Sequence, residues 1–207
     1  MRSILVAILF ISSLVNIHAQ TFSPDLSTWD KETLNKARLA SYNPLCQKKS
    51  NDVVFYTNLA RMDGTKFVET ILRPYMEFYG DTSFSPYLQS LIDWLYTKQN
   101  QPPLRHNLGL AIMAKFYALD AGRRGIVGHD RFNQRFQLVL ATRREVAENC
   151  SYGEENPLGV VIQLLVDEGI DNLGHRRNIL SKSLKRIGVG FARHKRYGIN
   201  CIQEFSR

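Results

Sequence analysis

The 207-residue sequence contains little cysteine and, after its first residues, no long hydrophobic run. Its three cysteines, Cys46, Cys150 and Cys201, allow at most one disulfide, which excludes a small domain held together by many disulfide bonds. A membrane-spanning helix needs about 20 consecutive apolar residues, and no segment after residue 19 provides them. Internal repeats and Gly/Ser-rich linkers are also absent, so we expect one main domain.

Residues 1–19, MRSILVAILFISSLVNIHA, have the layout of a secretory signal peptide. Arg2 precedes an apolar run from Ile4 to Leu14, and the segment ends in the small residue Ala19. This run is shorter than a membrane span. The sequence therefore predicts export to a secreted, periplasmic or extracellular location, with a mature chain that starts near Gln20 and has no transmembrane segment.

Positive charge is concentrated near the C-terminus. Residues 176–207 contain nine Lys or Arg and a single acid, Glu204, whereas residues 1–175 contain eighteen residues of each sign. Such a segment is usually a solvated face, and the alternative is a binding surface for an anionic glycan, lipid or cell envelope. Nucleic acid is not an expected partner, because the sequence has no zinc-finger or helix-turn-helix pattern.

Hydrophobic periodicity predicts mainly helices before residue 140. A polar helix is expected over 28–40, the first helix of the main domain over 51–61 with Asn51 as its cap, and further helices over 66–80 and 85–99. The pattern over 104–122 predicts a helix that ends at Gly122. Its apolar face would hold Leu104, Leu108, Ala111, Ile112 and Leu119.

Two more helices are expected in the second half of the chain. One begins near Asp130, and the other begins at Asn156, has Pro157 in its first turn and ends at Gly169.

The period changes to that of strands near the C-terminus. Residues 187–193 and 198–206 form a predicted antiparallel hairpin around HKRY, and residues 146–152 form a further strand. Helices around a small, mainly antiparallel sheet predict an α+β fold with an α-β-α arrangement. Because Cys150 and Cys201 lie on strands of the same predicted sheet, we expect them to form the one disulfide and Cys46 to stay unpaired.

Five motifs follow one another in a specific order: TNLAR, DAGRRGIVGHDRF, AENCSYG, GHRRNIL and IGVGF. In this order they resemble the CAP superfamily of cysteine-rich secretory, antigen 5 and pathogenesis-related proteins, in its bacterial SCP-like extracellular form. The resemblance covers about residues 51–207 and leaves 20–50 as an N-terminal approach segment. The sequence lacks the His-Xaa-Thr-Gln-Xaa-Val-Trp pattern and the multiple disulfides of animal and plant members. It also carries a helical insertion at about 63–100, which either shapes the binding cleft or is padding.

The resemblance implies a three-layer α-β-α sandwich with a cleft where two histidines and two acids meet. By motif these are His129 in VGH, Glu148 in AEN and His175 in GHRRN. The fourth position is Asp167 or Glu168 in VDEG, and the count from the helix start favours Asp167. The other two histidines of the mature chain, His106 and His194, are expected on the surface.

Two imidazoles and two carboxylates suit a divalent cation such as zinc, with His129 and His175 as the metal ligands. The resemblance therefore predicts a secreted binding module for a small molecule, lipid, glycan or divalent cation. The alternative is a metal-assisted extracellular hydrolase in which Glu148 is the base. A nucleophilic Cys150 is disfavoured, because the residue is expected on a strand in an oxidising compartment.

Overall fold

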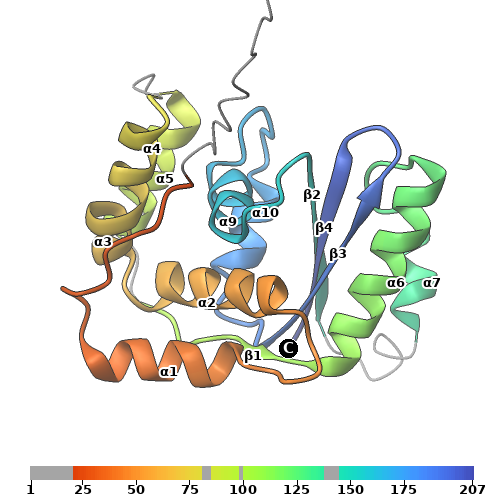
Figure 1. The fold of residues 1–207 in the computed structure, drawn as a ribbon, viewed down its shortest axis with the longest axis horizontal. Coiled ribbons are helices and arrows are strands. Elements are labelled where there is room, and N and C mark those ends of the chain that lie inside the picture. The colour runs from red at the N-terminus through yellow and green to blue at the C-terminus, as the bar shows by residue number, and fades with distance from the viewer. Residues whose placement is uncertain (1–20, 81–84, 98–99, 138–144) are drawn as a thin grey trace, which may run out of the picture.

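The computed structural model describes residues 21–80, 85–97, 100–137 and 145–207, and within them a four-stranded mixed sheet lies between two layers of helices (Figure 1). The predicted signal peptide lies outside these residues. The strands are β1 (Arg105–His106), β2 (Val146–Tyr152), β3 (Arg186–His194) and β4 (Gly198–Ser206), in the order β1-β3-β4-β2. β4 is antiparallel to both β2 and β3, whereas the short β1 is parallel to β3. The predicted C-terminal hairpin and the strand over 146–152 are confirmed.

Helix α6 (Leu108–Arg124) packs on one face of the sheet, and α2 (Lys48–Met62), α9 (Pro157–Val166) and α10 (Gly174–Ile179) pack on the other. Helix α1 (Lys31–Ser41) lies against α2. The described part of 63–100 is helical and consists of α3 (Gly64–Phe67), the π-helix η1 (Val68–Leu72), α4 (Arg73–Phe78) and α5 (Pro86–Thr97). The fold is therefore α+β and has the predicted α-β-α layers. No helix in these described ranges is long and apolar enough to cross a membrane.

The contact between α6 and β3 depends on glycine. A methyl group on Gly188 or Gly190 of β3 would collide with the backbone of α6, and one on Gly122 would collide with the carbonyl oxygen of Arg193. Helix and strand backbones therefore approach each other directly. Gly122 lies inside α6, and the predicted helix end there is wrong: the helix runs on to Arg124, and the left-handed Gly125 (φ 70°) ends it.

The predicted apolar face is wrong for Ile112 and Leu119, whereas Leu104 and Ala111 are buried as predicted. The close approach to β3 favours small side chains on most of the contact, so α6 buries Ala111, Ala114, Ala118 and Ala121 in addition to Leu110 and Tyr117. Its larger aliphatic residues Ile112 and Leu119 are exposed.

Two other predicted helix ends are shifted. Helix α2 begins at Lys48, and Asn51 lies inside it and exchanges hydrogen bonds with the backbone of Asn43 instead of capping the helix. Helix α9 has the predicted cap, because the Asn156 side chain accepts hydrogen bonds from the backbone of its first turn. It ends at Asp167, before the predicted Gly169, in a left-handed conformation (φ 60°).

The predicted disulfide between Cys150 and Cys201 is not formed, and all three cysteines are free. In the pairing of β2 with β4, Cys150 lies opposite Ile202 and Cys201 lies opposite Ser151. Adjacent residues of a strand point to opposite faces of the sheet, so the two thiols are on different sides of it. Cys201 belongs to the larger core cluster beneath α2 and α9, whereas Cys150 packs with the residues beneath α6.

Candidate functional site

A cavity of about 710 Å³ is lined by both His129 and His175. His129 lies in the loop after α6, and His175 lies in the first turn of α10. Residues of β2 and α9 form further parts of the walls, and Tyr75 and Met76 of α4 show that the helical insertion also lines the cavity. The fold thus brings the two Gly-His motifs of the sequence to one cavity.

The His129 loop is held in place by two tyrosines. The Tyr117 hydroxyl donates to the carbonyl oxygen of Gly128 (2.5 Å) and accepts from the backbone N–H of Asp130 (2.9 Å). The Tyr152 hydroxyl accepts from the backbone N–H of Gly128 (2.9 Å), where the backbone has a φ of 93°. Burial raises the pKa of Tyr117 to about 12, so this hydroxyl stays a donor at neutral pH. The backbone on both sides of His129 is therefore fixed.

Glu148 orients the His129 ring through a contact with Nδ1. Nδ1 of His129 lies 2.7 Å from Oε1 of Glu148, whose side chain is only 1% exposed. Arg135 at the end of α7 (Phe132–Arg135) donates to both oxygens of this carboxylate, at 2.5 and 3.0 Å. Burial raises the pKa of Glu148, but the hydrogen bonds from His129 and Arg135 outweigh it and leave the pKa lowered. The group is therefore ionised at neutral pH.

Arg135 also joins a second buried acid to the site. Its Nη1 donates to Oε1 of Glu204 (2.7 Å), which lies directly opposite Glu148 in the pairing of β4 with β2. Its guanidinium carbon lies 3.6 Å from the centre of the Tyr117 ring, a cation–π contact. Burial and the neighbouring charge of Glu148 raise the pKa of Glu204 far above its usual range. One arginine thus balances one carboxylate, and the second acid stays protonated.

The His175 ring is held by Asp167. Nδ1 of His175 lies 2.6 Å from Oδ1 of Asp167, and Oδ2 accepts from the backbone N–H of His175 (2.9 Å) and of Arg176 (3.2 Å). Glu168, the other candidate, accepts from the Ser85 hydroxyl instead (2.5 Å). Both acids line the cavity, but only Asp167 contacts His175.

Asn149 connects the two halves of the site. This residue follows Glu148 on β2, and its side-chain amide donates to the carbonyl oxygen of His175 (3.2 Å). Its Oδ1 accepts from the side chain of Asn178 on α10 (2.8 Å). The AEN motif therefore supplies both the partner of His129 and the link to the helix that carries His175.

Both histidines have the same hydrogen-bonding arrangement. In each ring Nδ1 is bound to a buried carboxylate, which fixes the tautomer with the proton on Nδ1. No hydrogen bond from the described residues reaches Nε2 of His129 or His175. Nε2 is thus the ring atom with a lone pair left for a ligand, and the carboxylate on the other side of the ring fixes its orientation.

Cys150 lies next to the His129 half of the site. Its Sγ is 3.8 Å from Nδ1 of His129, and ligand atoms of His129, Glu148 and Cys150 lie within 4.8 Å of one another. Within the described residues, this is the group of three or more such side chains that could hold a metal ion, and it does not include His175 or Asp167. Burial and the nearby Glu148 raise the pKa of the Cys150 thiol well above its usual value, so the sulfur is not a nucleophilic thiolate.

A family model described as the cysteine-rich secretory protein family, CAP, matches residues 31–205. The chain belongs to the CAP family. The match begins where α1 begins, inside the predicted approach segment 20–50, and so extends over most of the chain. No curated protein matches the chain significantly.

Sequence reasoning missed four side chains that build this CAP site: Tyr117, Arg135, Tyr152 and Glu204. Glu204 was within reach of prediction, because an acid inside the apolar strand pattern 198–206 is unusual for a buried position. The other three make contacts that depend on tertiary structure, and the local sequence carries no signal for them.

The other two histidines are not surface residues, contrary to the prediction. His194 is buried: its Nε2 donates to the carbonyl oxygen of Ile126 (2.9 Å), and its Nδ1 accepts from the backbone of Arg196 and Tyr197. His106 is half-buried, and its Nδ1 lies 2.8 Å from Oδ1 of Asn51. Both rings stabilise turns away from the cavity.

Arg176 of the GHRRNIL motif is fully buried and stabilises the packing of α10. Its guanidinium donates to the carbonyl oxygens of Leu165 and Val166 on α9 and of Tyr87 on α5, and to the Ser90 hydroxyl. It therefore fixes α10, and with it His175, against the helices of 63–100.

Proposed function

We propose that this CAP domain is an exported binding module whose cavity binds a divalent cation, zinc being the best match, through Nε2 of His129 and of His175. The observation that carries the proposal is the shared geometry of the two rings. Each donates Nδ1–H to a buried carboxylate and has an Nε2 that no hydrogen bond from the described residues reaches, and both line one cavity. Export rests on the signal-peptide pattern of residues 1–19.

The chemistry of the donors favours zinc over a harder cation. Imidazole nitrogens are preferred zinc ligands, with bonds of about 2.0–2.1 Å, whereas calcium and magnesium take oxygen ligands. Glu148 and Asp167 already hold the rings through Nδ1, so they orient the ligands. The remaining coordination positions would be open to a small polar molecule or water, as in zinc sites that are not purely structural.

The hydrolase alternative has less support. A metal-assisted hydrolase needs a base that can take a proton from the attacking water. Glu148 cannot do so, because both of its oxygens are bound by Arg135 and His129 and its side chain is buried. Cys150 is a protonated, buried thiol. Binding is therefore the function that the site supports best.

Titration calorimetry with zinc on the purified mature protein tests the proposal. We expect His129→Ala and His175→Ala each to lower zinc affinity at least tenfold, and His106→Ala, which removes a histidine outside the cavity, to leave it unchanged. Failure of the wild-type protein to bind zinc would refute the cation claim. If Cys150→Ser abolished binding while His175→Ala did not, the His129, Glu148 and Cys150 group would be the site, and the two-histidine proposal would be wrong.

A further inference from the structure

The positive charges of residues 176–207 do not gather in one place. Arg176 is buried against backbone carbonyls. Arg186 and His194 mark the opposite ends of the nine-residue strand β3, about 26 Å apart at 3.3 Å per residue. Among the cations of this segment, only Arg193, Lys195 and Arg196 lie at the hairpin end. The basic C-terminal face expected from the sequence is therefore divided between two ends of the sheet.

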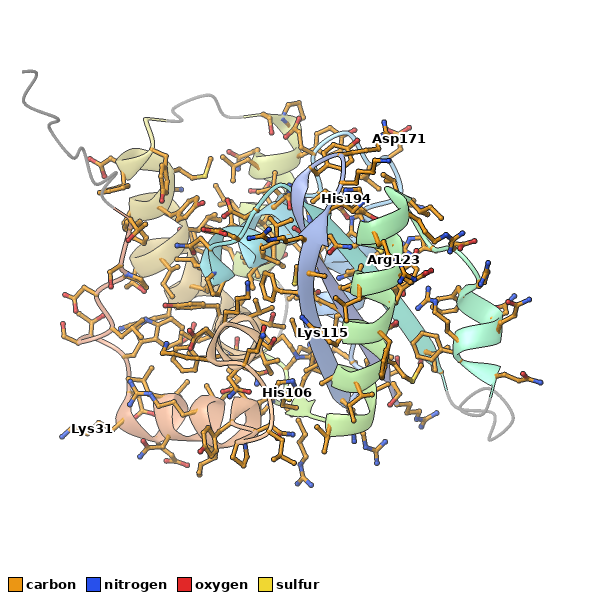
Figure 2. All side chains as sticks on the ribbon, turned by 45° about the vertical axis from the view of Figure 1, so that its right-hand side comes forward. Lys31, His106, Lys115, Arg123, Asp171 and His194 are labelled. Carbon is orange, nitrogen blue, oxygen red and sulfur yellow. The ribbon has the colours of Figure 1, made fainter. Side chains whose placement is uncertain are left out.

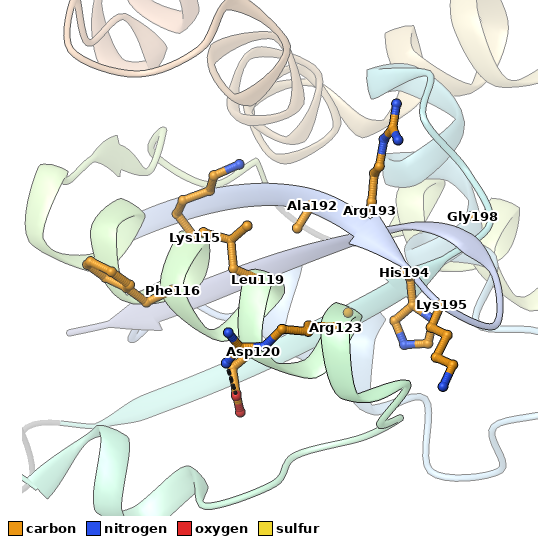
Figure 3. Close-up of a pocket in the computed structure, with 11 residues that line it drawn as sticks. Lys115, Phe116, Leu119, Asp120, Arg123, Ala192, Arg193, His194, Lys195 and Gly198 are labelled. Atoms are coloured by element: carbon orange, nitrogen blue, oxygen red, sulfur yellow. Dashed lines mark ion pairs between the residues drawn. The ribbon is translucent and has the colours of Figure 1, made fainter.

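A second group of cations joins those of the hairpin from α6. A groove with a volume of about 960 Å³ runs between α6 and the end of β3 (Figure 3). Its cationic residues are Lys115 and Arg123 on α6 and Arg193 and Lys195 on the hairpin. The half-buried Lys115 donates to the carbonyl oxygen of Phe191, and Arg123 lies 3.5 Å from the one acid of the groove, Asp120, so the hairpin supplies the exposed cations that have no acid beside them among the described residues. Lys115 and Arg193 extend to the same side of the sheet edge, with Leu119 and Ala192 between them (Figure 3). The groove thus has an apolar floor between positive ends.

Exposed apolar side chains border this groove. Ile112, Phe116 and Leu119 follow one another at helical spacing on the outer side of α6 and are 46%, 69% and 48% exposed. A smaller cavity of about 270 Å³ shares Lys115 and Phe116 with the groove and adds Leu45, which is 76% exposed. Ile112, Phe116 and Leu119 are exposed because α6 turns its small side chains to the sheet. Contiguous exposed apolar surface of this kind marks interaction sites.

We propose that this α6 surface, formed by the apolar residues Leu45, Ile112, Phe116 and Leu119 and the cations Arg193 and Lys195, docks the protein on an anionic lipid bilayer. Aromatic and aliphatic side chains partition into the headgroup region, and flanking Lys and Arg residues bind the phosphates of anionic lipids. An acidic glycan would use the cations but would leave the apolar residues exposed to water. The combination therefore favours a lipid surface.

This docking goes beyond the proposed function, because it uses a surface separate from the cavity of His129 and His175. The two lie on different sides of the hairpin end: the cavity is bounded by α9 and α10, and the groove by α6. The domain would sit on the membrane without spanning it and keep its cavity available to a ligand.

Co-sedimentation with vesicles tests the docking, using the mature protein and vesicles of phosphatidylcholine with or without phosphatidylglycerol. We expect binding to the anionic vesicles only, and weakening by salt as charges are screened. Phe116→Gln and Arg193→Glu should each reduce the bound fraction at least threefold. Both side chains are exposed, so the variants should fold, which circular dichroism verifies.

Matched controls come from α1, which lies away from α6. Leu39→Gln removes an apolar residue that is more exposed than Phe116 (81% against 69%), and Lys31→Glu reverses a charge far from Lys115 and Arg123 (Figure 2). Neither should change vesicle binding, and neither should His129→Ala or His175→Ala, so loss of the cavity function would not imitate loss of docking. Equal binding to neutral vesicles, or wild-type binding by Phe116→Gln, would overturn the proposal. Binding of a soluble acidic polysaccharide that depends on Arg193 and not on Phe116 would replace it with a glycan site.

Discussion

Asp167 receives three hydrogen bonds from the first turn of α10: Nδ1 of His175 at 2.6 Å, the backbone N–H of the same residue at 2.9 Å and that of Arg176 at 3.2 Å. One carboxylate therefore orients the proposed ligand ring and also satisfies the free N–H groups at the helix start. Both roles depend on its position at the end of α9, where it adopts a left-handed conformation.

The first prediction follows from this contact. Asp167→Asn keeps the size of the side chain but replaces one acceptor oxygen by a donor, so it cannot accept all three hydrogen bonds. We expect zinc affinity to fall about 10- to 100-fold, which is the usual cost of losing the carboxylate behind a metal-binding histidine. Calorimetry measures this, and Glu168→Gln, which changes the neighbouring acid that binds Ser85, is the control. Equal losses in the two variants would mean that Asp167 has no special role.

The second prediction concerns Arg135. Arg135→Met keeps much of the side-chain volume but removes the positive charge between Glu148 and Glu204, and leaves the Glu148 carboxylate buried without its main partner. Breaking a buried ion pair in this way destabilises proteins by about 3 kcal/mol or more. Urea unfolding should show this loss, and Arg131→Met, which removes an exposed arginine four residues earlier, should change stability little. Unchanged stability in Arg135→Met would show that the network is not needed for folding.

Much of the site was predictable because its residues lie in local motifs. Glu148 and His175 lie in the AEN and GHRRN motifs that carry the CAP resemblance, and the strand patterns put residues 146–152 in the same sheet as the C-terminal hairpin. Arg135 and Tyr117 were not predictable, because a buried arginine has no local signature: its partners come from β2, β4 and α6. The choice between Asp167 and Glu168 likewise depended on how α9 ends, which helical spacing alone does not determine.

On the outer face of α6, residues that the sequence predicted to be buried are exposed. Hydrophobic periodicity predicted that Ile112 and Leu119 face the core, because large apolar residues are normally buried. The glycines of β3 bring the backbones so close that alanines fill most of the contact, and Ile112, Phe116 and Leu119 turn outward. The information was present in IGVGF, but it concerned the partner strand and not the helix itself.

The third prediction concerns the cysteines. Cys150 and Cys201 are buried on opposite faces of the sheet, and Cys46 is half-buried in the connection between α1 and α2. Under native conditions we expect a thiol reagent to modify Cys46 alone, and under denaturing conditions to modify all three. Non-reducing peptide mapping of protein prepared in an oxidising medium provides an independent check. A peptide joining Cys150 to Cys201 would contradict the strand register.

The last prediction is the effect of pH on stability through Glu204. Burial and the adjacent Glu148 raise its pKa in the folded protein above the unfolded value, so the folded state binds a proton that the unfolded state releases. The contribution of this group to stability is complete below the unfolded pKa, near 4.3, and is lost as pH rises toward the folded pKa. Glu204→Gln removes the titration but keeps an uncharged side chain of the same shape. We therefore expect the stability of the variant relative to wild type to increase from about pH 5 to pH 9, by at most about 1.4 kcal/mol for each pH unit.

Urea unfolding of both proteins at several pH values gives the difference directly, and Glu145→Gln, which changes an exposed acid just before β2, serves as the control. A difference that stays constant with pH would mean that Glu204 is ionised in the folded protein, and that Arg135 balances two charges instead of one.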